Sequence, residues 1–320
     1  DWVGNYVGLL VRPYPNAHPG SIQGIGMQGG ALISGAPGGA SFSRSGVQID
    51  RVGDATTGAG ITIGESAANL NVFALLEFGV EARKSVCEVR HCRVLNGNSL
   101  NGNGVGIFSS ATSNEPGILE AHDNRITTRI GISTKSTQQV NIYDNTLTTA
   151  LFDPSDDMEV GILINQADAA VNINDNSINH FTEYGIYALD VRALDGTYDI
   201  VNNWINSTYD DAPQYDLTAI HIDNAATFSP ITKPFVFDNT INNVQRGIYL
   251  MDQPSIVENN IIIFKKPVGS TKPAAGIVNI TGDASNILNN TINGNCASCT
   301  DLDVRGIQNY DATHVFLIDN

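Results

Sequence analysis

The chain has few positive charges and lacks any long apolar run. Its 320 residues contain 17 Lys and Arg against 33 Asp and Glu, which gives a formal net charge of −16. An acidic surface repels nucleic acid and anionic membranes, so neither is expected as a partner. No apolar run approaches the length of a membrane span, which argues against membrane insertion. Acidic polysaccharides would also be repelled unless a cation such as calcium mediated the contact.

Cysteine is scarce, and the four that are present fall into two pairs. Cys87 and Cys92 would be roughly 16 Å apart in an extended strand, beyond disulfide reach. Both are therefore expected to be buried small apolar residues. Cys296 and Cys299 form a C-x-x-C motif, for which a short loop disulfide is favoured over half a zinc site. The motifs of serine, cysteine and metal-dependent hydrolases are absent, and no motif requires a cofactor.

A short phrase recurs eight times between Asp123 and the end of the chain: an acidic or amide residue, then Asn, any residue and an aliphatic residue. Consecutive copies are 20 to 36 residues apart, which is too regular for chance and too variable for a helical-hairpin array of fixed length. The pattern therefore predicts a solenoid. Its repeated asparagines are Asn124, Asn145, Asn176, Asn203, Asn239, Asn259 and Asn290, with Asn320 in the eighth copy.

Each unit contains two further strand-like segments. A Gly-aliphatic pair begins one of them, as at Gly106-Ile107, and an alternating segment leads into the Asn, as at Val171-Asn172-Ile173. Three short strands cannot enclose a core within one unit, but stacked units bury a continuous column of aliphatic side chains. Each strand is then expected to pair with its copy in the next coil.

These phrases resemble the right-handed parallel β-helix family, the fold of pectate lyases, polygalacturonases and phage tailspikes. The resemblance covers roughly residues 85–320 and is fainter over 42–84. It implies an all-β fold with three-strand coils and a ladder of stacked Asn side chains at one turn. Asn tolerates the left-handed backbone region, and its amide can bond to its copy about 4.8 Å away in the next coil.

The expected organisation is a Gly-rich cap or irregular region at residues 1–41, followed by a β-helix at 42–320. We also expect the β-helix to continue beyond residue 320. Ending there would leave half a coil with an open parallel edge and an uncapped apolar core.

An outward column of the Gly-Ile strands suggests a glycan-binding groove. One position past the aliphatic residue, three adjacent coils present Tyr187, His221 and Tyr249, and a neighbouring loop carries Tyr209 and Tyr215. Apolar sugar faces stack on aromatic rings while sugar hydroxyls bond to nearby acids. The alternative is ordinary outward stacking of aromatic side chains between coils, which any sheet favours.

Catalytic residues are less clearly indicated. Asp190 and Asp223, on neighbouring coils, are the best candidates for a carboxylate pair, because glycoside hydrolysis needs two carboxyls roughly 5 to 10 Å apart. Acidic residues are so common in this chain that such pairs also arise without a catalytic role. The resemblance to polygalacturonases would additionally imply Gly-His-Gly and Arg-x-Lys motifs, and neither is present in this sequence.

An acidic loop at residues 149–160 is a weak candidate for calcium binding. It does not match the D-x-D-x-D-G spacing of a defined calcium loop, and a solvated acidic loop is the favoured alternative. Its possible oxygen ligands are Asp153, Asp156, Asp157 and Glu159.

Together these features favour a secreted or cell-surface segment, structural or adhesive and non-catalytic, that acts as a stiff spacer and binds glycan. Its partners would be extracellular glycans or other surface and secretion proteins. The Asn-Thr-Ile phrases also resemble repeat-rich proteins that gliding bacteria secrete by the type IX system. Two alternatives stay open: a polysaccharide lyase or glycoside hydrolase, and a phage tailspike.

Overall fold

The computed structural model describes most of the chain from residue 45 onward and short segments before it. The described residues are 2–3, 7–11, 32–34, 45–53, 60–64, 70–74, 77–95, 104–112, 117–149, 158–194, 196–207, 217–224, 232–266, 273–281, 285–295, 304–311 and 315–320.

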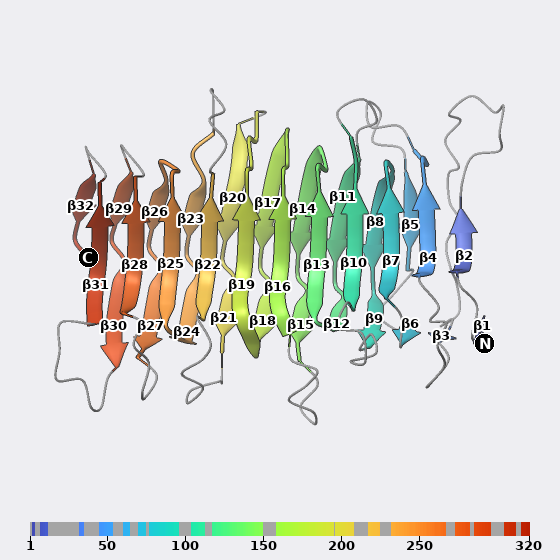
Figure 1. Ribbon diagram of the computed structural model, residues 1–320, viewed down its shortest axis with the longest axis horizontal. Coiled ribbons are helices and arrows are strands. Elements are labelled where there is room, and N and C mark those ends of the chain that lie inside the picture. Colours follow the sequence, from blue (N-terminus) through green and yellow to red (C-terminus); the bar gives the residue numbers. More distant parts are fainter. Residues whose placement is uncertain are drawn as a thin grey trace.

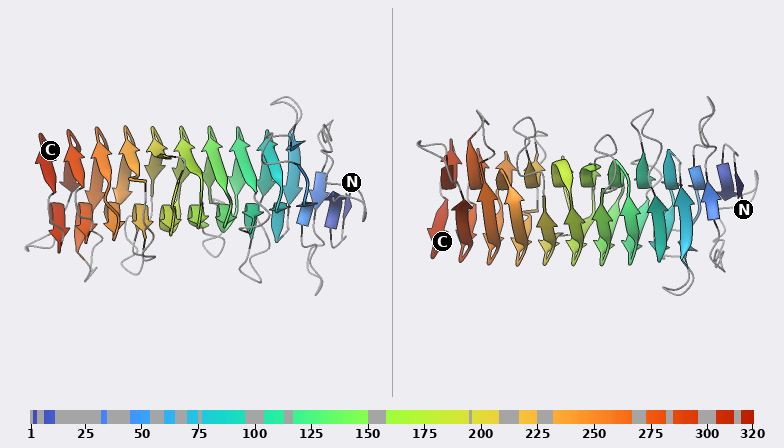
Figure 2. Two further views of the ribbon diagram at one scale, coloured as in Figure 1. Left: turned by 90° about the horizontal axis from the view of Figure 1, so that it is seen from above. Right: turned by 90° about the horizontal axis from the view of Figure 1, so that it is seen from below.

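The described strands form a right-handed parallel β-helix, as the sequence predicts. Three parallel sheets of 11, 10 and 11 strands wrap around one apolar core. The strands lie across a rod whose coils follow one another from the N-terminus to the C-terminus (Figures 1 and 2). Between residues 45 and 295, each coil contributes one strand to sheet 1, then one to sheet 2 and one to sheet 3.

Sheet 1 contains the Gly-Ile phrases. Its strands are β2 (Val7–Val11), β4 (Ser45–Asp50), β7 (Phe78–Arg83), β10 (Val105–Ser110), β13 (Ile130–Lys135), β16 (Met158–Asn165), β19 (Phe181–Leu189), β22 (Thr218–Asp223), β25 (Arg246–Met251), β28 (Ala274–Ile280) and β31 (Val304–Tyr310).

Sheet 2 contains the strands that lead into the Asn phrase. They are β5 (Ile61–Ile63), β8 (Val86–Arg90), β11 (Ile118–His122), β14 (Gln139–Tyr143), β17 (Ala170–Asn174), β20 (Thr197–Val201), β23 (Phe235–Phe237), β26 (Ile256–Glu258), β29 (Asn286–Leu288) and β32 (Phe316–Ile318).

Sheet 3 contains the strands that follow the ladder Asn. They are β1 (Trp2–Val3), β3 (Leu32–Ser34), β6 (Asn71–Ala74), β9 (Cys92–Leu95), β12 (Arg125–Thr127), β15 (Thr146–Thr148), β18 (Ser177–Asn179), β21 (Trp204–Asn206), β24 (Thr240–Val244), β27 (Ile261–Lys265) and β30 (Thr291–Asn295). Pairings of β2 with β4 and of β3 with β6 join strands from residues 1–41 to the same stack.

The Gly of the Gly-Ile phrase lies where sheet 3 and sheet 1 approach most closely. A Cβ atom on Gly131 would lie 2.2 Å from Leu147 Cδ2 and 2.4 Å from the Gly161 carbonyl oxygen. Real Cβ atoms do not approach other atoms so closely, so this corner favours a residue without a side chain. The Ile that follows the Gly points inward, and Ile132 and Ile162 are both fully buried in the aliphatic column.

The Asn ladder runs continuously through the turn between sheets 2 and 3. In a representative step, the backbone N–H and the side-chain Nδ2 of Asn145 both donate to Oδ1 of Asn176, over 3.1 and 3.0 Å. Nδ2 of Asn145 also donates to the carbonyl oxygen of Ala121 in the preceding coil, over 2.8 Å. Each ladder amide therefore satisfies backbone groups as well as its own copies, which buried polar groups require.

The structure divides the turn between two residues. The ladder Asn does not itself adopt the left-handed conformation that the sequence suggests. That conformation belongs to the residue before it, as at Asp144 (φ 53°) and Asp175 (φ 56°). Asp and Asn tolerate this backbone region better than most residues. The first position therefore provides the bend, and the second provides the side-chain amide.

One predicted ladder position is wrong by one residue. Asn259 has φ 56° and makes the bend, whereas Asn260 is fully buried and donates through Nδ2 to Oδ1 of Asn290. The sequence Asn259-Asn260-Ile261-Ile262 permits both registers. Burial decides between them, because Ile262 lies in the core while Ile261 is 47% exposed.

Two further residues extend the ladder column toward the N-terminus. Cys92 occupies the Asn position, and its backbone N–H donates to Oδ1 of Asn124 over 3.0 Å. Asn71, which the sequence analysis missed, pairs with Cys92 across sheet 3. Cys87 and Cys92 are buried free thiols, as expected. Burial raises the pKa of both, that of Cys92 to about 12.

Replacing Asn176 with Leu should lower the free energy of unfolding by about 1 to 3 kcal/mol, because the donors of Asn145 lose their acceptor. The side-chain Oδ1 of Asn203 would also lose the Nδ2 donor of Asn176 and would keep only the backbone N–H of that position. Urea denaturation followed by circular dichroism measures the change. Asn174→Ala is the matched control, since its side chain makes only an exposed contact with Asp175. Equal stability of Asn176→Leu and the control would contradict a stabilising ladder.

Candidate functional site

An aromatic row lies on the outer face of sheet 1, at the column that the sequence identifies. Tyr187 on β19 pairs with His221 on β22, which pairs with Tyr249 on β25. The ring centroids of Tyr187 and His221 are 4.8 Å apart, and those of His221 and Tyr249 are 4.7 Å apart. All three side chains are half-buried. The predicted residues are thus brought into direct contact over three successive coils.

Two residues outside the predicted set, Tyr184 and Arg246, enlarge this row. The ring of Tyr184 stacks on Tyr187, with centroids 4.7 Å apart, and lies 5.2 Å from His221. The guanidinium of Arg246 lies over the ring of Tyr249, 5.3 Å from its centroid. Tyr184 and Arg246 each stand directly before the Gly or Gly-equivalent position of their strand. Aligning that position in the sequence would have identified both.

The row is a ridge and not a flat platform. The interplanar angle is 34° between Tyr187 and His221 and 61° between His221 and Tyr249. Adjacent rings therefore meet at an angle and partly cover one another. Ring edges and partial faces offer apolar contact, and the Tyr hydroxyls can form hydrogen bonds, whereas Nε2 of His221 is buried.

Acidic residues border one end of the aromatic row. Burial raises the pKa of Tyr187, and the nearby charges of Asp223 and Asp190 raise it further. Asp190 lies in a left-handed turn (φ 52°), and its N–H donates to the carbonyl oxygen of Asp223 over 2.9 Å. The two residues are not in register, because Asp223 pairs with Leu189. Both negative charges act on the Tyr187 hydroxyl, and its raised pKa keeps it able to donate a hydrogen bond.

Several predicted site residues lie outside the described part of the chain. They are Tyr209, Tyr215, Asp153, Asp156, Asp157, Cys296 and Cys299.

Glu159 is the one calcium candidate that the structure describes. Its carboxylate forms an ion pair with Arg129 on the preceding coil. Among the residues that the structure describes, no three His, Cys, Asp or Glu side chains are grouped closely enough to hold a metal ion. The described residues also contain no helix long and apolar enough to cross a membrane.

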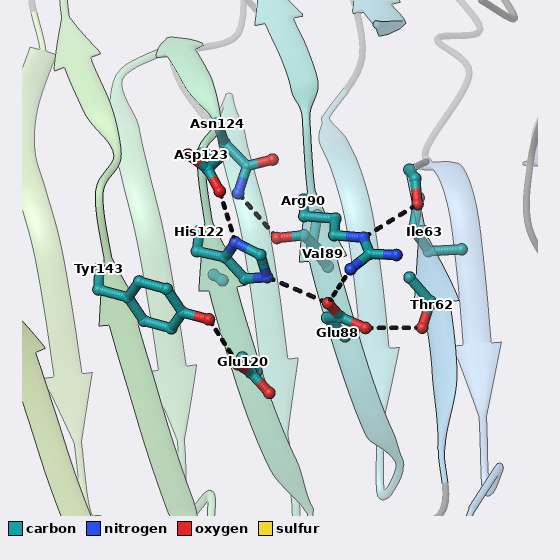
Figure 3. A network of polar contacts seen from close by, with 12 residues as sticks. Thr62, Ile63, Glu88, Val89, Arg90, Glu120, His122, Asp123, Asn124 and Tyr143 are labelled. Atoms are coloured by element: carbon teal, nitrogen blue, oxygen red, sulfur yellow. Dashed lines mark hydrogen bonds and ion pairs between the residues drawn. The ribbon is translucent and has the colours of Figure 1, made fainter. Parts of the chain in front are cut away.

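A second polar cluster, which the sequence analysis missed, lies on the outer face of sheet 2 (Figure 3). Glu88 on β8 is its centre. The Glu88 carboxylate accepts a hydrogen bond from Thr62 Oγ1 over 2.7 Å and forms an ion pair with Arg90 over 3.0 Å. Nε2 of His122 lies 3.1 Å from the same carboxylate, and its Nδ1 lies 2.8 Å from Asp123 Oδ2. Both ring nitrogens of His122 thus face carboxylates.

The electrostatics of Glu88 follow from these contacts. Burial alone would raise its pKa, but hydrogen bonds from Thr62 and His122 and the charge of Arg90 outweigh burial and lower it. Hydrogen bonds and positive charges favour the ionised carboxylate. Glu88 is therefore a structural carboxylate whose negative charge is balanced within the cluster.

Tyr143 and Glu120 continue the cluster on the next two strands. The ring of Tyr143 stacks on His122, with centroids 4.6 Å apart and an interplanar angle of 4°. Its hydroxyl donates to Oε1 of Glu120 over 2.6 Å. Glu120 pairs with Glu88 across adjacent strands, so two carboxylates project from the same face one coil apart. Reading the outward column of sheet 2 in the sequence, as was done for sheet 1, would have found this pair.

Comparison with protein-family models, with characterised proteins and with solved structures found no match to this chain.

The Glu88 contacts predict an acid-dependent contribution to stability. A carboxylate whose folded-state pKa is lowered stabilises the fold above its ordinary pKa of 4.5, and this stabilisation is lost as the pH falls below that value. The difference in unfolding free energy between wild type and Glu88→Gln should be largest near neutral pH and should shrink on acidification. Urea denaturation between about pH 3 and pH 7 measures it.

Glu258→Gln is the control for this measurement, because it removes one negative charge from the same sheet without touching the cluster. A difference for Glu88→Gln that does not vary with pH would show that the contacts do not favour the ionised form.

Proposed function

We propose that this chain is a stiff β-helix segment of an exported cell-surface protein, structural or adhesive, whose aromatic row on sheet 1 binds glycan. The observation that carries the proposal is the contact of Tyr184, Tyr187, His221 and Tyr249 on an outward face, bordered by Asp190 and Asp223. Aromatic rings beside hydrogen-bonding acids suit a sugar, which presents apolar C–H faces and hydroxyls.

The architecture supports the spacer part of the proposal. The described coils are joined strand to strand in three parallel sheets, and a ladder of Asn amides, buried from Asn124 to Asn290, connects them as far as Asn320. Coils bonded in this way form a rod that holds a binding face at a fixed orientation (Figure 2). Such a rod suits a role between a cell surface and an extracellular glycan or another surface protein.

The negative charge of the chain favours a neutral glycan over an acidic one as the ligand. The chain carries a formal net charge of −16, and the aromatic row is itself bordered by carboxylates. A neutral glycan avoids the repulsion that a polyuronate would meet. We therefore expect neutral glycans to bind without a cofactor and without added calcium, and chelation should leave binding unchanged.

The test is a glycan array with wild type and the double variant Tyr187→Ala/Tyr249→Ala. Each ring contributes about 1 kcal/mol of stacking, so the double variant should bind roughly 30-fold more weakly. Trp204→Ala is the control, because Trp204 is an aromatic residue on sheet 3 that is 50% exposed. Loss of binding in the Trp204 variant alone would move the glycan site to sheet 3 and contradict the proposal.

A polysaccharide-degrading activity is the principal competing function. The proposal predicts no release of reducing ends and no unsaturated product from any polysaccharide on the array. Turnover that disappears in Asp190→Asn or Asp223→Asn would replace the adhesive function with a catalytic one.

A further inference from the structure

The outer face of sheet 2 contains a depression with a volume of about 280 Å³. Four polar side chains form one row of its lining. They stand at equivalent positions on four neighbouring strands. This row is Thr62, Glu88, Glu120 and Asn141. The depression lies on a different sheet from the aromatic row, so its role does not depend on the glycan-binding proposal.

A second row of lining residues makes the depression hollow and partly apolar. Val86, Ile118 and Gln139 stand at equivalent positions on β8, β11 and β14. Gly60 precedes β5 and adds no side chain to this row. A Cβ atom there would lie 2.6 Å from Val86 Cγ1 and 2.4 Å from the Val86 carbonyl oxygen. The depression thus combines methyl groups with an adjacent line of oxygen and amide groups.

The two carboxylates of the depression differ in how their charge is balanced. Glu88 is an ion-pair partner of Arg90 and also faces His122. Glu120 accepts a hydrogen bond from the neutral hydroxyl of Tyr143 at Oε1, and no cationic side chain among the described residues contacts it. The negative charge of Glu120 is therefore the uncompensated charge of this site.

The state of Tyr143 supports this assignment. Burial raises the pKa of its hydroxyl, and the hydrogen bond to Glu120 and the charge of that residue raise it further. The phenol thus remains a donor. It orients one oxygen of Glu120 and leaves the other, Oε2, available for a ligand.

We propose that this depression binds a primary ammonium group carried on a compact carbon frame. The ammonium would meet Glu120, the side-chain carbonyls of Gln139 and Asn141 would accept its remaining hydrogens, and Val86 and Ile118 would contact the carbon frame. A bare metal ion fits less well, because the described acidic and His side chains are not grouped to share one. Free amino sugars and Lys side chains both have this chemistry.

The volume agrees with a ligand of this size. Sites for drug-sized molecules have volumes of roughly 300–1,000 Å³. A depression of about 280 Å³ therefore suits one hexosamine ring or one Lys side chain. A longer segment would have to extend out of it along the sheet.

The experiment titrates the full chain with glucosamine and with Nα-acetyl-lysine amide, and follows backbone amide chemical shifts by NMR. N-acetylglucosamine and the Nε-acetylated Lys derivative are the matched neutral probes. The ammonium probes should shift the resonances of β8, β11 and β14, and the neutral probes should not. Tighter binding of glucosamine would identify an amino sugar as the ligand. Tighter binding of Nα-acetyl-lysine amide would identify a protein Lys side chain.

Glu120→Gln keeps the acceptor for Tyr143 but removes the charge. It should weaken ammonium binding by about tenfold or more, since hydrogen bonds to charged groups are worth at least that factor. Glu258→Gln removes the same charge from the same sheet at a distant strand and should bind as wild type does. Circular dichroism of both variants confirms that the fold is retained.

Three results would overturn the proposal. They are equal affinity of Glu120→Gln and wild type, equal affinity for acetylated and free amines, and displacement of the amine by micromolar calcium, which would indicate a metal site. The double variant Tyr187→Ala/Tyr249→Ala should bind the ammonium probes normally. The glycan proposal for sheet 1 and the ammonium proposal for sheet 2 can therefore be contradicted independently.

Discussion

The hydrogen bond from one buried Asn amide to the next holds successive coils at a fixed spacing and register. Oδ1 of Asn176 accepts both the backbone N–H and the side-chain Nδ2 of Asn145, so it ties the turn of one coil to the turn of the next. This contact requires the coils to be one strand spacing apart and in register. Equivalent residues must then stand in columns on all three sheets. Outward clusters such as the aromatic row exist because of this constraint.

Much of the fold could be predicted from the sequence, because its signals are local and repeated. The bend residue, the ladder Asn and the Gly-Ile pair each recur at a position where only a few residue types fit. Prediction was wrong where two registers fit equally well, as at Asn259 and Asn260, and the burial of Ile262 decided between them. The division of the turn between a bend residue and an amide residue also required backbone angles, which residue types alone do not fix.

The candidate sites were predicted less completely, for an identifiable physical reason. Tyr187, His221 and Tyr249 follow the aliphatic residue at a constant offset, so aligning the repeats places them together. Tyr184 was missed because it lies on the other side of Gly185, where the regular alternation of inward and outward residues does not carry through. The Glu88 cluster was missed because its members differ in type. Only their contacts show that Arg90 pairs with the Glu88 carboxylate, while no cationic side chain among the described residues contacts Glu120.

The direction of the sheet hydrogen bonds has a mechanical consequence. Strands lie across the rod, so the bonds between coils point along its axis (Figure 1). A pulling force applied to the two ends would load the hydrogen bonds of one coil after another. A shearing force would load the hydrogen bonds of many coils at once. Bending and compression are opposed instead by the packed column of Ile side chains in the core. The rod should therefore resist buckling well and yield to tension by releasing single coils, each of which adds a length of extended chain.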